Sequence, residues 1–93
     1  MEINYDTAKN ARNILLRGLS FDRAAEFDLE RALVLIDDRR DYGEVRYRAF
    51  GALDERLHVL VFTETARGIR VISLRRANKR EVKRYGTQTK GKP

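Results

Sequence analysis

The segment from Leu57 to Thr63 is apolar on both faces of an extended chain, with the single exception of His58. Such a strand belongs in the middle of a sheet, because a strand with one face in water alternates between apolar and polar side chains. Further stretches with the composition of strands lie at residues 2–5, 32–36, 44–51 and 69–74. The chain is therefore predicted to build a sheet around Leu57–Thr63, with the continuous apolar run 32–36 as another buried strand.

Two helices are predicted between the first and second strands. Asp6 and Ser20 stand where an N-cap side chain can accept free amide hydrogens, and Gly18 can end the first helix in a left-handed conformation. The first helix has one apolar side, predicted to face the core, which is formed by Ala8, Ala11, Ile14 and Leu15. The second helix is predicted to bury Phe21, Ala24, Ala25 and Phe27.

A C-terminal helix is predicted to begin at Asn78, which forms a capping-box pattern with Glu81, and to run to about Tyr85. The order of elements is then β-α-α-β-β-β-β-α. The predicted fold class is α+β, with an antiparallel sheet of four or five strands, two N-terminal helices and one C-terminal helix. Residues 1–86 are expected to form a single domain, and the small, polar and basic residues 87–93 a flexible tail.

Positive charge is concentrated towards the C-terminus. Residues 1–66 contain 10 Lys and Arg against 13 Asp and Glu, whereas residues 67–93 contain 10 Lys and Arg against Glu81 alone. Clustered cations indicate a polyanion or an acidic protein as partner, although a solvated basic helix and tail has the same composition. The chain has no cysteine for a disulfide or thiolate site and no apolar stretch typical of a membrane span or signal segment, so a cytoplasmic protein is expected.

Several common enzyme classes lack their motifs in this chain. The single histidine, the absence of cysteine and the absence of a Gly-x-Ser-x-Gly turn argue against acyl transfer, and no glycine-rich phosphate loop is present. The one carboxylate cluster consists of Asp37, Asp38, Asp41 and Glu44. Arginines at positions 39, 40, 46 and 48 compete for these carboxylates, so local ion pairs are expected rather than a metal site, and no cofactor is predicted.

RNA cleavage fits the remaining residues and needs no metal. A base removes the proton of a ribose 2′-hydroxyl, the oxygen attacks the adjacent phosphate, and arginines stabilise the negative charge that develops. Alternation places Glu44, Arg46 and Arg48 on one face of one strand. That face can meet the cations of the last strand and its exit, which are Arg70, Arg75 and Arg76. The same spacing is compatible with a cross-strand ion-pair ladder on a solvent-facing sheet.

Two further residues are secondary candidates for a functional role. His58 could act as a general acid, and Tyr85 could stack on an RNA base. For His58 the alternative is a hydrogen-bonded residue of the core or sheet edge, and for Tyr85 it is packing of the last helix. Packing is the prediction for Tyr85.

Short motifs follow one another in a fixed order: Asp6-x-x-Lys9, Asn13, Gly18-Leu19-Ser20-Phe21, Gly43-Glu44-x-Arg46, Gly51, Val61-Phe62-Thr63, Ile69 to Ala77, Glu81 and Tyr85. No single motif is specific, whereas their order and separations together are. On this pattern the chain resembles the BrnT family of bacterial toxins over essentially its whole length up to Tyr85.

The resemblance implies an endoribonuclease toxin of a type II toxin–antitoxin module, with a RelE-like fold, which cleaves RNA without a metal and inhibits translation and growth. It also implies a cognate antitoxin, BrnA, that binds the toxin in a hetero-oligomer and binds promoter DNA. Carried over by position, the expected catalytic residues are Lys9, Glu44, Arg46, Arg70, Ser73 and Arg75. Further cations expected to bind RNA are Arg48, Arg76, Lys79, Arg80 and Lys83.

The roles assigned within this set follow from the side-chain chemistry. Glu44 is the base or an orienting carboxylate, and Ser73 donates a hydrogen bond. Arg46, Arg70 and Arg75 hold phosphate, because a guanidinium can bind two phosphate oxygens at once. Lys9 adds positive charge.

One departure from the family lies at Leu16-Arg17-Gly18, where the family commonly has Lys-His-Gly. Arg17 cannot replace a histidine as a proton donor near neutral pH, because its pKa is far too high. Either the helix face with Leu16 binds the antitoxin, or activity is altered in this member. Two other functions stay open: a non-enzymatic nucleic-acid binder that uses residues 67–93, and a structural partner of an acidic protein.

Overall fold

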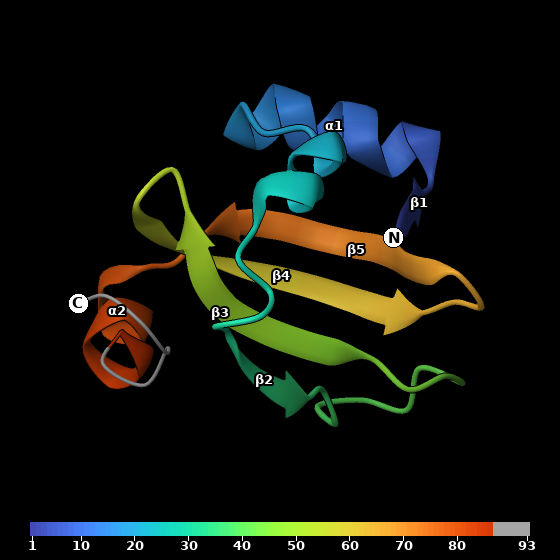
Figure 1. The fold of residues 1–93 in the computed structure, drawn as a ribbon. Coiled ribbons are helices and arrows are strands. Elements are labelled where there is room, and N and C mark those ends of the chain that lie inside the picture. Colours follow the sequence, from blue (N-terminus) through green and yellow to red (C-terminus); the bar gives the residue numbers. More distant parts are fainter. Residues whose placement is uncertain (87–93) are drawn as a thin grey trace.

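The computed structural model describes residues 1–86, so the predicted flexible tail at 87–93 lies outside the described residues. Five strands form one sheet in the order β1-β5-β4-β3-β2. The strands are β1 (Glu2–Tyr5), β2 (Leu33–Ile36), β3 (Tyr47–Leu53), β4 (Arg56–Glu64) and β5 (Gly68–Arg76). The helices are α1 (Thr7–Arg17), the 3₁₀ helix η1 (Phe21–Glu26) and α2 (Lys79–Tyr85). Figure 1 shows α1 and η1 above the sheet and α2 beside the end of β5.

The sheet is mixed, and the prediction of a purely antiparallel sheet was wrong. Strands β3, β4 and β5 form the predicted hairpins around the central β4. Strand β1 instead pairs with β5 in parallel, with Glu2 opposite Gly68. A Cβ atom on Gly68 would collide with the Glu2 backbone, so this approach requires a glycine. Local patterning gave no sign of this pair, because its strands lie at opposite ends of the chain.

Strand β2 lies at the edge of the sheet, where it pairs with β3 alone. Leu33 and Leu35 are partly buried, but Val34 and Ile36 are exposed. The prediction of a fully buried strand at 32–36 was therefore wrong. A continuous apolar run is typical of a strand covered on both faces, and β2 is covered on one.

The α+β class is confirmed, with one α-helix near each end of the described chain. The predicted second N-terminal helix is the 3₁₀ helix η1, capped by the Ser20 hydroxyl. Phe21, Ala24 and Phe27 are buried as predicted, whereas Ala25 is exposed. A 3₁₀ helix has three residues per turn, so this short element presents a narrower buried face than an α-helix.

Helix α1 has the predicted caps but buries the side opposite to the one predicted. Asp6 accepts hydrogen bonds from two backbone amides, and Gly18 ends the helix at φ 66°. The predicted core side is exposed throughout, and Asn13 is the helix's buried residue. The Asn13 amide nitrogen donates to the backbone oxygens of Leu19 at 2.8 Å and Leu74 at 2.9 Å. These two polar contacts dock α1 beside β5, beyond the point where β1 ends.

The sheet has an apolar cluster on each face. The larger one packs η1 and the residues around it against the sheet and includes Phe21, Leu60 and Leu74. The smaller one contains Phe50, against which Tyr85 of α2 stacks with 4.1 Å between ring centroids. The predicted packing role of Tyr85 is therefore confirmed. Neither α-helix within residues 1–86 combines the length and apolar character needed to cross a bilayer.

Candidate functional site

The side of the sheet on which α2 packs carries most of the predicted site residues, and we call it the α2 face. Phe50 of β3 contacts α2 on this side, and Arg48 lies two residues earlier on the same side. Val61 of β4 pairs with Arg48 on one side and Ser73 on the other, so Ser73 faces the same way. Arg70 pairs with Thr63, which lies two residues after Val61 on β4, so Arg70 is also on the α2 face.

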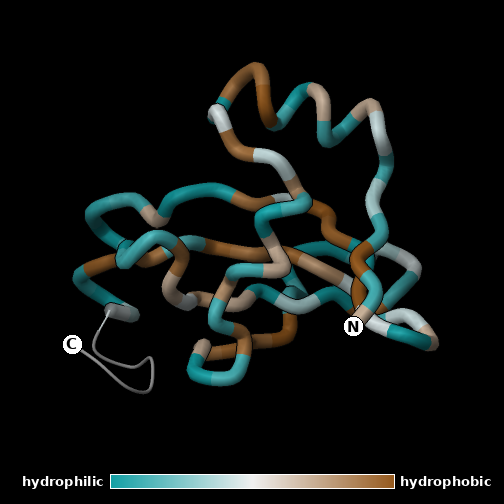
Figure 2. The backbone as a smooth tube through the Cα atoms, turned by 45° about the horizontal axis from the view of Figure 1, so that its top comes forward, coloured by the Kyte–Doolittle hydropathy of each residue, from teal (hydrophilic) through white to brown (hydrophobic). Residues whose placement is uncertain are grey.

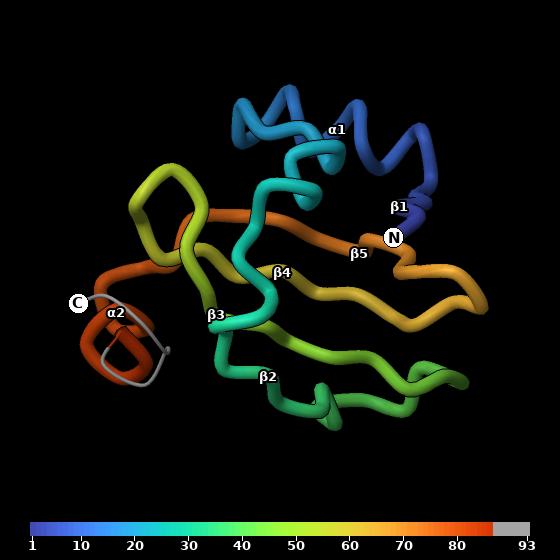
Figure 3. Tube along the Cα trace, in the orientation of Figure 1, coloured from blue at the N-terminus to red at the C-terminus, as the bar shows by residue number. Residues whose placement is uncertain are grey.

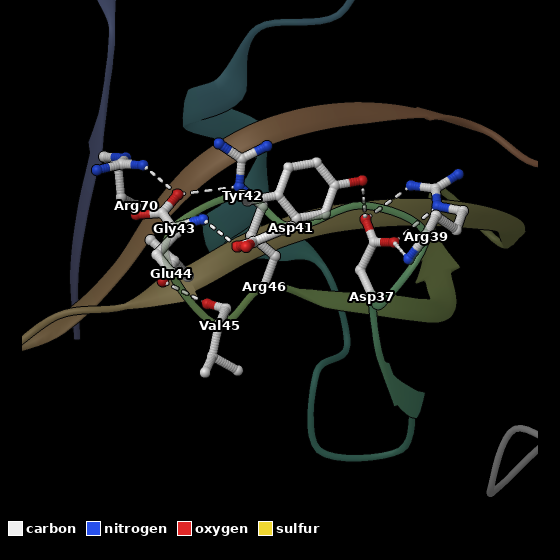
Figure 4. Close-up of polar contacts among 10 residues, drawn as sticks. Asp37, Arg39, Asp41, Tyr42, Gly43, Glu44, Val45, Arg46 and Arg70 are labelled. Carbon is white, nitrogen blue, oxygen red and sulfur yellow. Dashed lines mark hydrogen bonds and ion pairs between the residues drawn. The ribbon is translucent and has the colours of Figure 1, made fainter.

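The loop between β2 and β3, traced in Figure 3, holds Glu44 and Arg46. The Asp37 carboxylate is buried and accepts two hydrogen bonds of 2.7 Å from the Arg39 guanidinium and one of 3.3 Å from the Tyr42 hydroxyl. The Asp37 backbone nitrogen also donates to the Arg46 backbone oxygen at 2.7 Å. Figure 4 shows the side-chain contacts. The loop is therefore fixed from within, next to the start of β3.

Glu44, Arg46 and Arg70 meet at this loop, and we call them the Glu44 cluster. Arg46 Nε donates to Glu44 Oε2 at 2.9 Å, and Arg70 Nη2 donates to the same oxygen at 2.8 Å. The Arg46 guanidinium lies over the Tyr42 ring, 4.2 Å from its centroid. Figure 4 shows the two arginines approaching the carboxylate from different parts of the chain. The structure thus brings together three of the predicted site residues.

The charge state of the Glu44 cluster follows from these contacts. The hydrogen bond from Arg46 lowers the pKa of the Glu44 carboxyl, and the nearby charge of Arg70 lowers it further, against a smaller opposing effect of burial. Each guanidinium carries five N–H donors, and the bonds to Glu44 use one from each. The cluster can therefore bind a further anion, such as a phosphodiester, through the donors that remain.

Arg48 lies further along the α2 face and has an unusual environment. Its Nε is buried and has no hydrogen-bond partner within residues 1–86. Its guanidinium carbon lies 5.8 Å from the centroid of the Phe50 ring. A buried donor without an acceptor is costly, so this nitrogen is a candidate contact for a bound anion. The Ser73 hydroxyl, across β4, makes no hydrogen bond to any described side chain or backbone group.

Arg75 is bound to α2 rather than to the Glu44 cluster. Its two terminal nitrogens donate to the two Glu81 oxygens, both at 2.8 Å. These bonds lower the pKa of the Glu81 carboxyl to about 2. Five strand steps of about 3.3 Å separate Arg70 from Arg75, which amounts to about 16 Å. In this structure Arg70 is bound by Glu44 and Arg75 by Glu81, so the two arginines belong to separate ion pairs.

A cavity of about 500 Å³ lies where the end of β5 meets the Gly18 turn and the β3–β4 hairpin, and we call it the arginine cavity. Its lining includes His58 and five arginines, which are Arg17, Arg23, Arg56, Arg75 and Arg76. Arg23 is bound to Asp54 at 2.7 Å and to Glu26 at 2.9 Å. The side chains of Arg17, Arg56 and Arg76 make no ion pair with any residue of the described range. Three unpaired guanidiniums around one cavity indicate an anion site.

His58 lines the arginine cavity but is almost completely buried. Its Nδ1 lies 2.9 Å from the Arg56 backbone oxygen. Because a carbonyl oxygen only accepts hydrogen bonds, Nδ1 carries the proton in this contact. His58 is therefore a buried, hydrogen-bonded residue of the sheet, which is the alternative to a general acid.

The remaining predicted cations lie apart from the Glu44 cluster. Lys9, on α1, lines a second cavity of about 200 Å³ that also includes Ile72. Lys79, Arg80 and Lys83 are exposed on α2 and make no ion pair within the described chain. Within residues 1–86 there is no group of three or more His, Asp or Glu side chains arranged to hold a metal. In the acidic loop, Asp37 and Glu44 are instead bound by arginines.

Sequence reasoning missed two features of these sites. Tyr42 supports Arg46, and its position directly before Gly43-Glu44 was the available signal. Arg56 was missed because the arginine cavity collects its cations from four separate segments of the chain. No local pattern indicates such a collection.

Comparison with known proteins gives one match. The family model described as "Ribonuclease toxin, BrnT, of type II toxin-antitoxin system" matches residues 5–81. No curated protein and no solved structure matches the chain. The matched range contains the whole Glu44 cluster and extends from the end of β1 into α2. The chain therefore belongs to the BrnT family of ribonuclease toxins of type II toxin–antitoxin systems.

Proposed function

We propose that this protein is an endoribonuclease toxin that cleaves RNA at the Glu44 cluster without a metal ion. The observation that carries the proposal is one carboxylate oxygen held by two arginines from separate parts of the chain, at 2.9 and 2.8 Å. Family membership supports the ribonuclease activity. The geometry supports the location, because RNA cleavage needs cations at the phosphate and a carboxylate beside them.

The proposed reaction begins when an RNA phosphate takes over hydrogen bonds from Arg46 and Arg70. Glu44 then loses the contacts that lower its pKa, so its carboxylate becomes a stronger base. Glu44 accepts the proton of the ribose 2′-hydroxyl, the 2′-oxygen bonds to phosphorus, and the bond from phosphorus to the 5′-oxygen breaks. The 5′-oxygen takes up a proton from water, Glu44 returns its proton to the resulting hydroxide, and the other product ends in a 2′,3′-cyclic phosphate. The two arginines stabilise the charge that develops on the phosphate.

The rest of the RNA is proposed to follow the α2 face towards the arginine cavity. Arg48 offers the unpartnered Nε, and Ser73 offers a free hydroxyl. Arg75 and Arg76 bind phosphates further along, about 16 Å from Arg70 by strand rise. Lys79, Arg80 and Lys83 add positive potential beside this path. Lys9 is proposed to have no part in the reacting group.

The wider assignment belongs to the same proposal. Residues 1–86 act as a single domain with a fold of the RelE type, supported by the α+β architecture and the family match. The toxin acts in the cytoplasm, where its cleavage of RNA inhibits translation. A cognate BrnA-like, DNA-binding antitoxin neutralises it in a hetero-oligomer, as a type II module requires.

The proposal is tested with purified, antitoxin-free protein and end-labelled RNA in EDTA. Glu44→Gln and Arg46→Gln are expected to reduce cleavage at least tenfold, because each removes one member of the cluster. Asp38→Asn and Arg40→Gln are matched controls, since both residues are exposed in the same loop without an ion pair to a described residue. A 2′,3′-cyclic phosphate on the product is expected.

Three results would contradict the assignment. Cleavage that requires Mg²⁺ would exclude the reaction as written. Undiminished cleavage in both cluster variants would exclude the site. RNA that stays intact with folded protein would exclude the enzyme and favour a non-enzymatic nucleic-acid binder.

A further inference from the structure

Helix α1 presents its apolar side to solvent. Leu15 is 83% exposed, Leu16 is 70% exposed and Ile14 is 45% exposed. Ala8 and Ala11 are exposed on the preceding turns, on the same side as Ile14 and Leu15, at spacings of three and four residues. Leu16 lies next to this side, together with Lys9 and Arg12. Figure 2 shows the hydrophobic stretch at the C-terminal end of the helix on the outer rim of the molecule. We call Ala8, Ala11, Ile14 and Leu15 the α1 stripe.

The stripe is exposed because α1 is attached through its other side. Asn13 donates to the Leu19 and Leu74 backbone oxygens, and Asn10 Oδ1 accepts from the Phe21 backbone nitrogen at 2.7 Å. A helix docked by two asparagines has no need of an apolar opposite side for folding. Contiguous exposed apolar surface of this kind marks an interaction site.

The charges around the stripe determine which partner fits. Helix α1 contains Lys9, Arg12 and Arg17 and no acidic residue. The 200 Å³ cavity beside it has the same three cations together with the apolar side chains of Leu16, Phe21 and Ile72. A partner with a large apolar side chain flanked by carboxylates would fill the cavity and pair with these cations.

A second copy of this chain does not meet that description. A two-fold dimer through the stripe and the cavity would bring together two copies of a helix that carries three cations and no acidic residue. RNA would pair with the cations but would leave Leu15 and Ile14 in water. A heterologous acidic and amphipathic segment satisfies both the apolar and the charged parts of the surface.

We propose that the α1 stripe and its adjacent cavity are the docking site for an acidic amphipathic segment of the antitoxin. This inference rests on the proposed function only for the existence of an antitoxin, which a type II module implies. In Figure 1, α1 lies on the side of the sheet covered by η1, whereas the Glu44 cluster lies on the α2 face. Antitoxin docking and RNA cleavage are therefore separable by mutation.

The test measures binding of the antitoxin encoded beside the toxin gene, by calorimetric titration of the purified full-length toxin. Leu15→Glu is expected to weaken binding at least tenfold, because it places a charge in the apolar contact and repels the carboxylates that flank the partner's apolar side chain. Ile36→Glu is the matched control, since Ile36 is also apolar and 62% exposed but lies on β2. Arg12→Glu is expected to weaken binding, with Arg40→Glu as its control.

Cleavage of RNA by the same variants separates this inference from the proposed function. Leu15→Glu is expected to cleave RNA at the wild-type rate and to escape neutralisation. Unchanged antitoxin affinity of Leu15→Glu would overturn the docking site, whether or not the protein cleaves RNA. A wild-type dimer without antitoxin that Leu15→Glu converts to monomer would overturn it in favour of a second copy. If wild-type protein does not cleave RNA but Leu15→Glu loses antitoxin binding, the docking site is supported and the endoribonuclease assignment is contradicted.

Discussion

The Asp37 carboxylate is buried inside the loop that carries the Glu44 cluster, where Arg39 and Tyr42 both donate to it. Tyr42 then supports the Arg46 guanidinium, so the Asp37 carboxylate acts on the side chain of a proposed catalytic residue through Tyr42. The sequence places Asp37 at the start of a polar turn but contains no sign of its burial. That burial depends on a tertiary contact, the hydrogen bond from its own backbone nitrogen to Arg46.

Tyr42→Leu is predicted to reduce the rate of RNA cleavage about fivefold with little change in stability. The ring stacks on Arg46 at 4.2 Å, and an interaction of this kind contributes about 1 kcal/mol at an accessible site. Tyr42→Phe is the control, because it keeps the ring and loses only the 3.3 Å hydrogen bond to Asp37. Equal cleavage rates in the Leu and Phe variants would show that the stack does not position Arg46.

The Asp37 carboxyl predicts a defined acid sensitivity of folding. The hydrogen bonds from Arg39 lower its pKa from 3.8 to about 2. The stabilisation, about 2 kcal/mol, is therefore fully present above pH 3.8 and is lost as the pH falls towards 2. Asp37→Asn should lower the free energy of unfolding by about that amount at pH 7, and the difference from wild type should shrink below pH 4. Chemical denaturation at several pH values measures this, and Asp38→Asn should show no such trend.

At the scale of elements, the sequence predicted what is local and missed what is tertiary. The caps at Asp6, Ser20 and Asn78 are all observed, because each depends on residues within three positions. The buried side of α1 was predicted wrongly, because Asn13 binds the backbone of Leu74, 61 residues away. The meeting of Glu44 with Arg70 was predicted from a strand over 44–51, but β3 begins at Tyr47, so Glu44 and Arg46 lie in the preceding loop and this part of the strand prediction was wrong. The separation of Lys9 from them depends on how α1 docks.

Because α1 is docked through polar contacts, replacing its buried asparagine with an apolar residue should destabilise the fold more than replacing an exposed leucine with a polar one. Asn13→Leu should lower the free energy of unfolding by about 2–3 kcal/mol, because it leaves two buried backbone oxygens without a donor. Leu15→Asn should change it by no more than about 0.5 kcal/mol, since Leu15 is exposed. Urea unfolding monitored by circular dichroism measures both. A greater loss in Leu15→Asn would mean that the stripe packs against the fold.

At the scale of the whole molecule, the sheet separates the proposed cleavage site from the proposed docking site. The α2 face carries the Glu44 cluster, and the opposite side carries η1 and α1 with its exposed stripe. The net charge of +6 is not spread evenly, because the arginine cavity gathers three guanidiniums that no described carboxylate neutralises. Of these three arginines only Arg76 belongs to the basic region 67–93, so the proposed anion site also uses Arg17 and Arg56 from the rest of the chain.

The arginine cavity predicts a change in the salt dependence of RNA binding. With a non-cleavable 2′-O-methyl RNA, the Arg56→Gln/Arg76→Gln double variant should bind with a slope of log K against log salt reduced by about 1.4, at about 0.7 per lost phosphate contact. Arg40→Gln/Arg67→Gln removes the same charge outside the cavity and should leave the slope nearly unchanged. Equal slopes in the two double variants would show that only total charge matters.

The parallel pairing of β1 with β5 affects when this toxin can form during its synthesis. Strand β1 cannot pair until β5, which begins at Gly68, has been synthesised. Strand β5 also supplies Arg70, Ser73 and Arg75. A nascent chain that lacks β5 cannot add β1 to the sheet, and it lacks most of the residues proposed to contact RNA. The RNA-binding surface proposed for this protein is therefore complete only after β5 has been synthesised and has paired with its neighbours.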